Sequence, residues 1–381
     1  GKLRANWSQV GRDTNPYQLS FDYPLGTPYG SRQVQSLPGS LPNENLEREL
    51  KSSWEVGLQM DFLNNRVGVD ATYYDSETSD LIQRVATSRA SGFSSRVLNA
   101  GTISNKGVEL ILTGTPILTE DFSWDLQLNW SKNVNEVESL AEGIENLPIN
   151  RFDTSPPFGP EIVARVGEEF GTFWGNGFVR DENGNKVLDE NGFYEQEGPK
   201  VLGSYQPDWT WSAATTLTYK SVTANILVDG QKGGDIWSLS NLFGLYSGMF
   251  EETARDNIRE LGMQPEGVLA DGTPFQGESL GPAKNVFQTL FGNHEAHLYD
   301  ASYIKLREVT VSYDLPRRWF GSVPLQGLQV AAIGRNLATL LRYTPNFDPT
   351  AVTRSAGNLQ GIEAGQLPPK RTYGLRIRAS F

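Results

Sequence analysis

Apolar and polar residues alternate strictly along several parts of the chain. In the clearest stretch, from Trp54 to Phe62, every second residue is apolar, and the residues between them include Glu55 and Asp61. A period of two is the pattern of a β-strand with one apolar and one polar face. The alternation returns in 122–131. The pattern therefore predicts a chain built mainly of strands that are exposed on a polar face.

Tight turns separate successive alternating stretches. Asn64-Asn65, the stretch 119–121 and Lys220-Ser221 each lie between two such stretches, which predicts antiparallel hairpins. Twelve candidate strands follow along the chain, at residues 2–10, 52–62, 66–75, 104–114, 122–131, 161–167, 171–179, 209–219, 222–230, 302–314, 325–335 and 371–381.

Two of these strands have special features. The stretch 161–167 is short, and it is included partly because the topology needs a strand there. Within 302–314 the apolar positions change phase between Leu306 and Val309, which predicts a β-bulge.

The links between the predicted strands alternate in length. Short links are expected at 63–65, 115–121, 168–170, 220–221 and 315–324. Long links are expected at 11–51, 76–103, 132–160, 180–208, 231–301 and 336–370. Bacterial outer-membrane barrels have short periplasmic turns and long external loops. The predicted fold class is therefore all-β, a transmembrane antiparallel β-barrel of about 12 strands in this chain, with the six long links on the outside.

Tryptophans lie at or near the ends of several predicted strands. Amphipathic rings prefer the membrane–water interface, so these residues are predicted to form an aromatic girdle. They are Trp54, Trp124, Trp130, Trp209 and Trp211.

Composition is compatible with this fold. Only 38% of residues are hydrophobic and the mean hydropathy is −0.42, because lumen-facing residues and loops dilute the apolar band. No apolar run approaches the ~20 residues of a spanning helix. Cysteine is absent, which suits export through an oxidising compartment. The net charge of −12 argues against a nucleic-acid partner.

Several segments resemble the SusC/RagA class of TonB-dependent outer-membrane transporters of Bacteroidota. The strongest is His294-Glu295 together with 299–316, which reads YDASYIKLREVTVSYDLP. Shorter matches occur in the order expected for the family, at 4–11, 104–109, 334–337 and 368–374.

This resemblance implies a barrel of roughly 22 strands that encloses a plug. Residues 1–381 would be the C-terminal portion of that single barrel domain, with the plug and the TonB-contacting segment upstream. We expect Gly1 to be a processing boundary within a larger protein, because no signal peptide opens the chain. The implied activity is energised import of oligosaccharides or oligopeptides across the outer membrane of a Gram-negative bacterium. The implied partners are a SusD-type surface lipoprotein, the TonB complex and outer-membrane lipid.

The last predicted strand alternates from Tyr373 to Phe381 and ends on the aromatic residue. Its resemblance to the ends of outer-membrane barrels implies that Tyr373 and Phe381 form a recognition signal for the outer-membrane assembly machinery.

A second interpretation is a secreted or surface-attached β-rich module that binds glycans and has no pore. It requires the apolar faces to be buried between two sheets. The alternating polar residues, such as Gln59 and Asp125, give no sign of a second apolar face.

Aromatic residues of the long links are candidates for substrate binding, because aromatic rings can stack on sugars. They can equally pack the loops against themselves or a partner. The candidates are Trp174, Trp237, Phe243 and Tyr246.

Other motifs give little support for catalysis or metal binding. His294 and His297 are the only histidines, and a zinc site needs at least three protein ligands. Asp181 and Asp189 begin two similar Asp-Glu-Asn-Gly segments whose spacing does not fit an EF-hand, and Asn-Gly turns explain them more simply. No catalytic motif stands out, so we expect no enzyme activity, metal or cofactor.

Overall fold

The computed structural model describes residues 1–14, 16, 18–150, 158–277, 284–321, 323–353 and 360–381. Parts of the predicted links 11–51, 132–160, 231–301, 315–324 and 336–370 lie outside the described residues.

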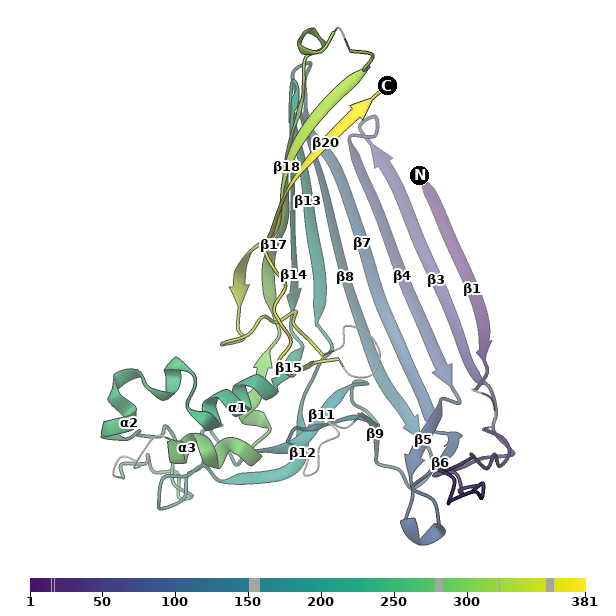
Figure 1. Cartoon of the computed structure of the whole chain (residues 1–381), viewed down its shortest axis with the longest axis vertical. Coiled ribbons are helices and arrows are strands. Elements are labelled where there is room, and N and C mark those ends of the chain that lie inside the picture. The colour runs from purple at the N-terminus through teal and green to yellow at the C-terminus, as the bar shows by residue number, and fades with distance from the viewer. Residues whose placement is uncertain (15, 17, 151–157, 278–283, 322, 354–359) are drawn as a thin grey trace.

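The largest element is a curved antiparallel sheet of ten strands, which we call the wall (Figure 1). Neighbours in its spatial order are also neighbours along the chain, apart from the short strands of the long connections. The strands in spatial order are β1 (Lys2–Arg12), β3 (Glu49–Phe62), β4 (Val67–Ser79), β7 (Gly101–Leu118), β8 (Phe122–Leu140), β13 (Trp209–Tyr219), β14 (Val222–Lys232), β17 (Tyr303–Asp314), β18 (Gly327–Arg342) and β20 (Thr372–Ser380).

The apolar and polar faces of neighbouring wall strands are in register. Leu58 on β3 is opposite Leu3 on β1 and Ala71 on β4, while Gln59 is opposite Asp70. A shift of one residue would move every apolar side chain to the polar face, so the alternation itself specifies the pairing. The predicted alternation is confirmed, and it gives the wall one apolar and one polar face.

The long connections leave the same end of the wall, and their secondary structure gathers there (Figure 1). We call this region the cap; it comprises the described residues within 13–48, 80–100, 141–208, 233–302 and 343–371. Its strands are β2 (Ser40–Leu41), β5 (Ile82–Ala86), β6 (Ser95–Asn99), β9 (Asn146–Asn150), β10 (Glu161–Arg165), β11 (Thr172–Phe178), β12 (Gln196–Ser204), β15 (Asp235–Ser238), β16 (Leu298–Asp300) and β19 (Ile362–Glu363).

Helices occur mainly in the cap. The α-helices are α1 (Leu239–Ser247), α2 (Ile258–Leu261) and α3 (Lys284–Thr289). Single 3₁₀ turns cover Arg89–Ser91, Glu251–Thr253, Arg255–Asn257, Leu290–Gly292, Glu295–His297 and Arg317–Trp319. Among the described residues, no helix has the length and apolar character needed to cross a membrane.

Two of the twelve predicted wall strands do not belong to the wall. The predicted strands 161–167 and 171–179 correspond to β10 and β11, which form a separate four-stranded sheet with β9 and β12 in the cap. β10 is only five residues long, shorter than the roughly 9–11 residues that a membrane-spanning strand needs. Ile162, Val163 and Ala164 are all buried, so both faces of β10 are covered. The predicted short link 168–170 is therefore a turn within the cap.

The remaining short links leave the other end of the wall (Figure 1), although β7 continues to Leu118 within the predicted link 115–121. In the turn between β3 and β4, Leu63, Asn64 and Asn65 have φ of 52°, 53° and 64°. This left-handed geometry agrees with the predicted tight turn. The predicted bulge is also confirmed: Leu306 and Glu308 both pair with β14, and Arg307 between them is the extra residue.

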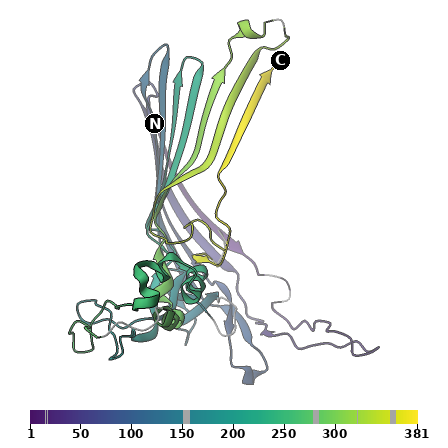
Figure 2. The same cartoon turned by 60° about the vertical axis from the view of Figure 1, so that its left-hand side comes forward.

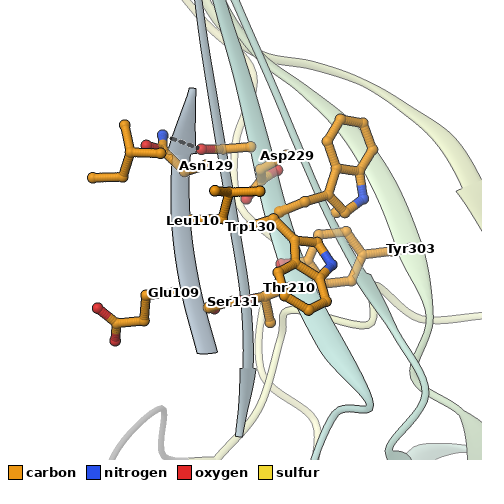
Figure 3. A pocket seen from close by; sticks show the side chains of 12 residues that line it. Glu109, Leu110, Asn129, Trp130, Ser131, Thr210, Asp229 and Tyr303 are labelled. Carbon is orange, nitrogen blue, oxygen red and sulfur yellow. Dashed lines mark hydrogen bonds between the residues drawn. The ribbon is translucent and has the colours of Figure 1, made fainter. Parts of the chain in front are cut away.

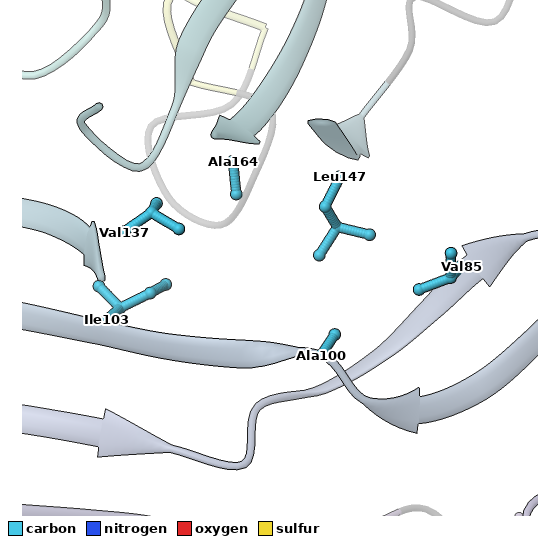
Figure 4. Close-up of a cluster of buried hydrophobic side chains, with 6 residues drawn as sticks. All are labelled: Val85, Ala100, Ile103, Val137, Leu147 and Ala164. Atoms are coloured by element: carbon cyan, nitrogen blue, oxygen red, sulfur yellow. The ribbon is translucent and has the colours of Figure 1, made fainter. Parts of the chain in front are cut away.

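A buried apolar cluster joins the wall to the cap (Figure 4). Ile103 on β7 and Val137 on β8 lie near the cap ends of their strands, and they pack with Leu147 on β9 and Ala164 on β10. The full cluster is Val85, Ala100, Ile103, Val137, Leu147 and Ala164. Because the side chains come from both parts, the cap is fixed to the wall by packing.

The wall is an open sheet. β1 and β20 are its two edges, and within the described residues each pairs on one side only (Figure 2). Every residue of β20 is exposed. Unpaired strand edges present a row of free N–H and C=O groups that can pair with further strands.

Candidate functional site

Polar side chains of neighbouring strands form hydrogen bonds across the polar face of the wall. The Asn129 amide donates to the Ser212 hydroxyl at 2.9 Å, and the hydroxyls of Ser131 and Thr210 are 2.8 Å apart. These pairs join β8 to β13, and each would be lost if the two strands shifted in register.

Ion pairs also lie on the polar face. Arg307 Nε donates to Asp229 at 2.6 Å, and Arg4 donates to Asp70 at 2.6 Å. Arg307 reaches Asp229 because the bulge re-aims its side chain, which is a common role of β-bulges.

A groove of about 430 Å³ lies at strands β7, β8, β13, β14 and β17, and residues from both faces of the wall line it (Figure 3). The side chains that line it from the polar face form two rows, because every second residue of a strand points to the same face. Figure 3 shows Glu109 and Asn129 on one side of the sheet and Trp130 on the other. One row contains Glu109, Ser131, Thr210 and Tyr303, and the other contains Ile111, Asn129, Ser212 and Asp229. Leu110, Trp130 and Trp211 also line the groove, so it offers a ligand both apolar surfaces and hydrogen-bonding groups.

An ion pair joins the wall to the cap beside Asp229, one of the residues that line the groove. Lys305 on β17 is the Cα partner of Asp229, and its buried ammonium donates to Asp348 Oδ2 at 2.6 Å and to Thr350 at 2.7 Å. Burial opposes ionisation of Asp348, but hydrogen bonds from Lys305 and Thr350 leave the pKa of its carboxyl below the usual value. The ion pair thus links β17 to residues 348–350 of the cap.

Glu363 on β19 holds α1 in place within the cap. Its buried carboxylate accepts from the hydroxyls of Ser238 at 2.5 Å and Ser240 at 2.7 Å, and from the Gly365 N–H at 2.7 Å. Ser238 is the N-cap of α1. A carboxylate at a helix N-terminus is favourable because the backbone dipoles point their positive ends toward it.

The predicted substrate-binding aromatics have different environments. Trp237 is fully buried in the cap core, at 0% exposure, so its face is not open to a ligand. Trp174 lies 5.0 Å from the Arg165 guanidinium. Phe243 and Tyr246 are both exposed on α1 and contact Phe291, with ring centroids 5.7 and 5.0 Å apart.

Phe158 completes this cluster, and sequence reasoning missed both it and Phe291. They lie in irregular segments with no periodicity that could have identified them.

The predicted girdle residues lie on wall strands and share the apolar face. Trp130 and Trp211 are Cα partners, and Trp209 pairs with Lys232. Trp130 is not at a strand end, because β8 continues to Leu140, beyond the predicted 122–131.

The other predicted girdle residues have side-chain partners on neighbouring strands. Trp124 donates its indole N–H to Thr215 at 2.8 Å. The Trp54 ring lies 5.2 Å from that of Tyr73. Tyr373 lies on the edge strand β20, Phe381 directly follows it, and both are highly exposed.

The two histidines have structural contacts in the cap. His294 Nδ1 accepts from the Asn176 N–H at 3.1 Å, and burial lowers its pKa. His297 is 1% exposed, and burial lowers its pKa to about 4. The described residues contain no group of three or more His, Asp or Glu arranged to hold a metal ion.

Glu295, between the two histidines, fastens this segment to β11. It accepts from the Phe178 N–H at 2.9 Å and from Arg180 at 2.6 Å. Burial opposes ionisation of Glu295, but these hydrogen bonds and the charges of Arg180 and Lys200 lower its pKa overall.

The two Asp-Glu-Asn-Gly segments are turns, as predicted. Asp181 Oδ1 accepts from the N–H groups of Asn183 and Asn185, and Asp189 Oδ1 accepts in the same way from Asn191 and Phe193. Hydrogen bonds from Asn185 lower the pKa of Asp181.

The family model described as TonB dependent receptor-like, beta-barrel, matches residues 1–248. TonB-dependent receptor P3 of Formosa agariphila and TonB-dependent receptor SusC of Bacteroides thetaiotaomicron are each 25% identical over the whole chain. The chain covers 39% and 37% of these relatives. It therefore spans about two fifths of the length of the curated relatives it matches.

A solved structure of the RagAB peptide transporter has a similar fold. All of this chain aligns to 40% of that chain, with a TM-score of 0.73 and 20% identity. In the structure of the RagAB importer in the "closed-closed" state the TM-score is 0.75.

Proposed function

The chain belongs to the family of TonB-dependent receptor-like β-barrels, and we propose that its wall is part of an outer-membrane importer for nutrients. The family consists of receptors and transporters rather than enzymes. In the proposed arrangement the apolar face contacts lipid, the polar face lines the lumen, and the cap lies on the cell surface. The resemblance to the SusC/RagA class supports oligosaccharides or oligopeptides as cargo.

The observation that carries this proposal is the shared orientation of faces and connections. Apolar side chains occupy one face across neighbouring wall strands, and all long connections leave one end. Leu58 and Val56 are exposed although both are apolar. A lipid environment explains this exposure, since lipid-facing residues of an outer-membrane barrel form an apolar band. The pore-free glycan-binding alternative is disfavoured because no second sheet covers this face in the described residues.

The complete importer would contain more strands than this wall. The open edges of β1 and β20 would pair with those strands to close a barrel of roughly 22 strands around a plug. TonB would engage segments outside this chain. A SusD-type surface lipoprotein would dock on the cap. We retain Trp174, Phe243 and Tyr246 as proposed substrate contacts, and Tyr373 with Phe381 as the proposed assembly signal.

Cysteine labelling of the full-length protein in cells tests the orientation. This chain has no cysteine. Asn183→Cys lies in a cap turn, and Glu120→Cys lies in the turn between β7 and β8. A membrane-impermeant maleimide should label Asn183→Cys on intact cells, and Glu120→Cys only after the outer membrane is permeabilised. Equal labelling of both variants on intact cells would refute the proposed orientation.

A further inference from the structure

Lysines follow the apolar residues on the apolar face of the wall, at its cap end. On β8 the residues of the apolar face, counted from the turn end of the wall, are Phe122, Trp124, Leu126, Leu128 and Trp130. The next residue on this face is Lys132. Lys132 is ten positions after Phe122. At about 3.3 Å per residue and a tilt near 40°, this separation gives a height of roughly 25 Å, the height of the apolar band of an outer-membrane barrel. Lys132 therefore lies where the hydrocarbon region ends.

The neighbouring strands repeat this arrangement. Trp209 is ten positions before Tyr219 on β13, and Lys232 is ten positions after Val222 on β14. Tyr219 pairs with Phe122 on β8 and with Val222 on β14. The ten-residue spans on β8, β13 and β14 therefore begin at the same height along the wall. Trp209 pairs with Lys232, and the pairing of Thr210 with Ser131 brings it beside Lys132. The indole thus stands between two lysines on the apolar face.

Lys106 on β7 adds a third cation. Lys106 pairs with Val134 and Val108 pairs with Lys132, so the two lysines are diagonal neighbours on the same face. Such neighbours lie about 7–8 Å apart. Lys132 and Lys232 are two strands apart, or about 10 Å. Three ammonium groups on flexible side chains can therefore converge on one small anion.

Two of these three charges have a carboxylate nearby. All three lysines are exposed, and neither Lys106 nor Lys132 has a carboxylate within ion-pair distance among the described residues, but Asp75 is the Cα partner of Lys106 on the same face. Lys232 lies 3.5 Å from Asp300, but both side chains are well exposed, so this pair is weak. At the turn end of the wall the equivalent row contains Phe122, Tyr219 and Val222 instead of lysines.

We propose that Lys106, Lys132 and Lys232, with Trp209 between them, bind the phosphate of a lipid headgroup in the outer leaflet of the membrane. The inference rests on the proposed membrane wall. On β8 the apolar residues, the Trp130 indole and the Lys132 ammonium follow one another in the order of hydrocarbon, interface and anionic headgroup, and Val134 and Glu136 then continue the same face toward the cap. Lysines close to an anionic membrane surface each strengthen binding roughly fivefold. An indole at the same level anchors the strand in the interface.

Native mass spectrometry of the purified full-length protein tests the site with diphosphoryl lipid A as the probe. Replacing all three lysines by Gln should weaken binding at least tenfold, and replacing them by Arg should preserve it. Lipid A stripped of its phosphates should bind wild type as weakly as diphosphoryl lipid A binds the Gln variant. Lys220→Gln is the matched control, because Lys220 is an exposed lysine at the opposite end of the same sheet, and it should bind like wild type.

Equal binding of diphosphoryl lipid A by wild type and the Gln variant would overturn the proposal, as would equal binding of the phosphate-free lipid. If the triple variant does not assemble, Lys132→Gln alone should weaken binding by roughly fivefold. Flotation with liposomes separates this inference from the function on which it rests. Wild-type protein that fails to float contradicts the membrane wall itself, whereas floating protein without phosphate dependence contradicts only the lipid site.

Discussion

His294 and Asn176 form a pair of hydrogen bonds that resembles a short β-ladder. The Asn176 N–H donates to the imidazole Nδ1 of His294 at 3.1 Å, and the His294 N–H donates to the Asn176 carbonyl at 2.9 Å. The side chain thus replaces a backbone acceptor beside β11. Because Nδ1 accepts, it carries no proton in the folded cap. The histidine of the sequence signature therefore fastens the segment before β16 to the β11–β12 hairpin.

Two substitutions at His294 should distinguish the contribution of this hydrogen bond to cap stability from the contribution of imidazole packing. Asn can place its amide oxygen where Nδ1 accepts, so His294→Asn should keep the contact. His294→Ala leaves the partly buried Asn176 N–H without its acceptor and should destabilise the cap by about 1 kcal/mol. Hydrogen exchange of the β11 amides measures the difference. Equal exchange in both variants would show that the imidazole acts only by filling space.

Acid should weaken the cap through His297. Its folded pKa of about 4 lies below the ordinary histidine value of 6.5, because burial disfavours the imidazolium. Between about pH 4 and 6.5 the unfolded segment binds more protons than the folded one. Stability is therefore lost as pH falls through this window. In His297→Gln, whose amide can still donate to the Leu290 carbonyl, hydrogen exchange of the cap should depend less on pH than in wild type.

Asp235 should have the opposite effect on the pH dependence of cap stability. Burial, together with the nearby charges of Asp300 and Asp208, raises the pKa of its carboxyl to about 6, against a hydrogen bond from the Ser204 N–H that lowers it. Between about pH 4 and 6 the folded state binds more protons, so the cap gains stability as pH falls. Asp235→Asn should stabilise the cap at pH 7 by roughly 1–2 kcal/mol. A gain of the same size at pH 4 would contradict the titration of Asp235.

The sequence predicted the wall better than the cap, for a physical reason. A strand with lipid on one face and polar surroundings on the other must alternate, and the stretch from Trp54 to Phe62 shows this in its residues alone. Ile162 to Ala164 are buried on both faces, so β10 has no alternation to distinguish a wall strand from a cap strand. Even the bulge at Arg307 was visible, because a bulge changes the phase of the alternation.

The groove was not predictable in the same way. Ser131 and Thr210 are 79 positions apart and meet only because β8 pairs with β13 across the whole connection 141–208. The prediction placed two extra wall strands in that connection, which would have separated them. Local patterns identify which side chains share a face, whereas strand order decides which of them meet.

Charge at the middle of the apolar face should block membrane insertion. Leu128 lies on this face, 36% exposed and midway between Phe122 and Lys132. Leu128→Arg should cost roughly 2–4 kcal/mol at the bilayer midplane. Gln127→Arg is the matched control, since its side chain projects from the polar face. Liposome flotation and protease resistance should fall for Leu128→Arg alone, and equal effects of both substitutions would argue against a lipid-facing side.

Removing one member of the Lys305–Asp348 pair should destabilise the protein more than replacing both members with apolar residues. Asp348→Ala leaves the Lys305 ammonium, which is 5% exposed, without its carboxylate and should destabilise the contact between cap and wall by about 3–5 kcal/mol. Replacing both residues, as Lys305→Met with Asp348→Leu, removes the buried charge and should recover most of that loss. Protease cleavage within 343–353 of the full-length protein reports release of the connection. Cleavage of the double variant as fast as that of Asp348→Ala would mean that the ion pair, and not merely the burial of an unpaired charge, holds residues 343–353 against the wall.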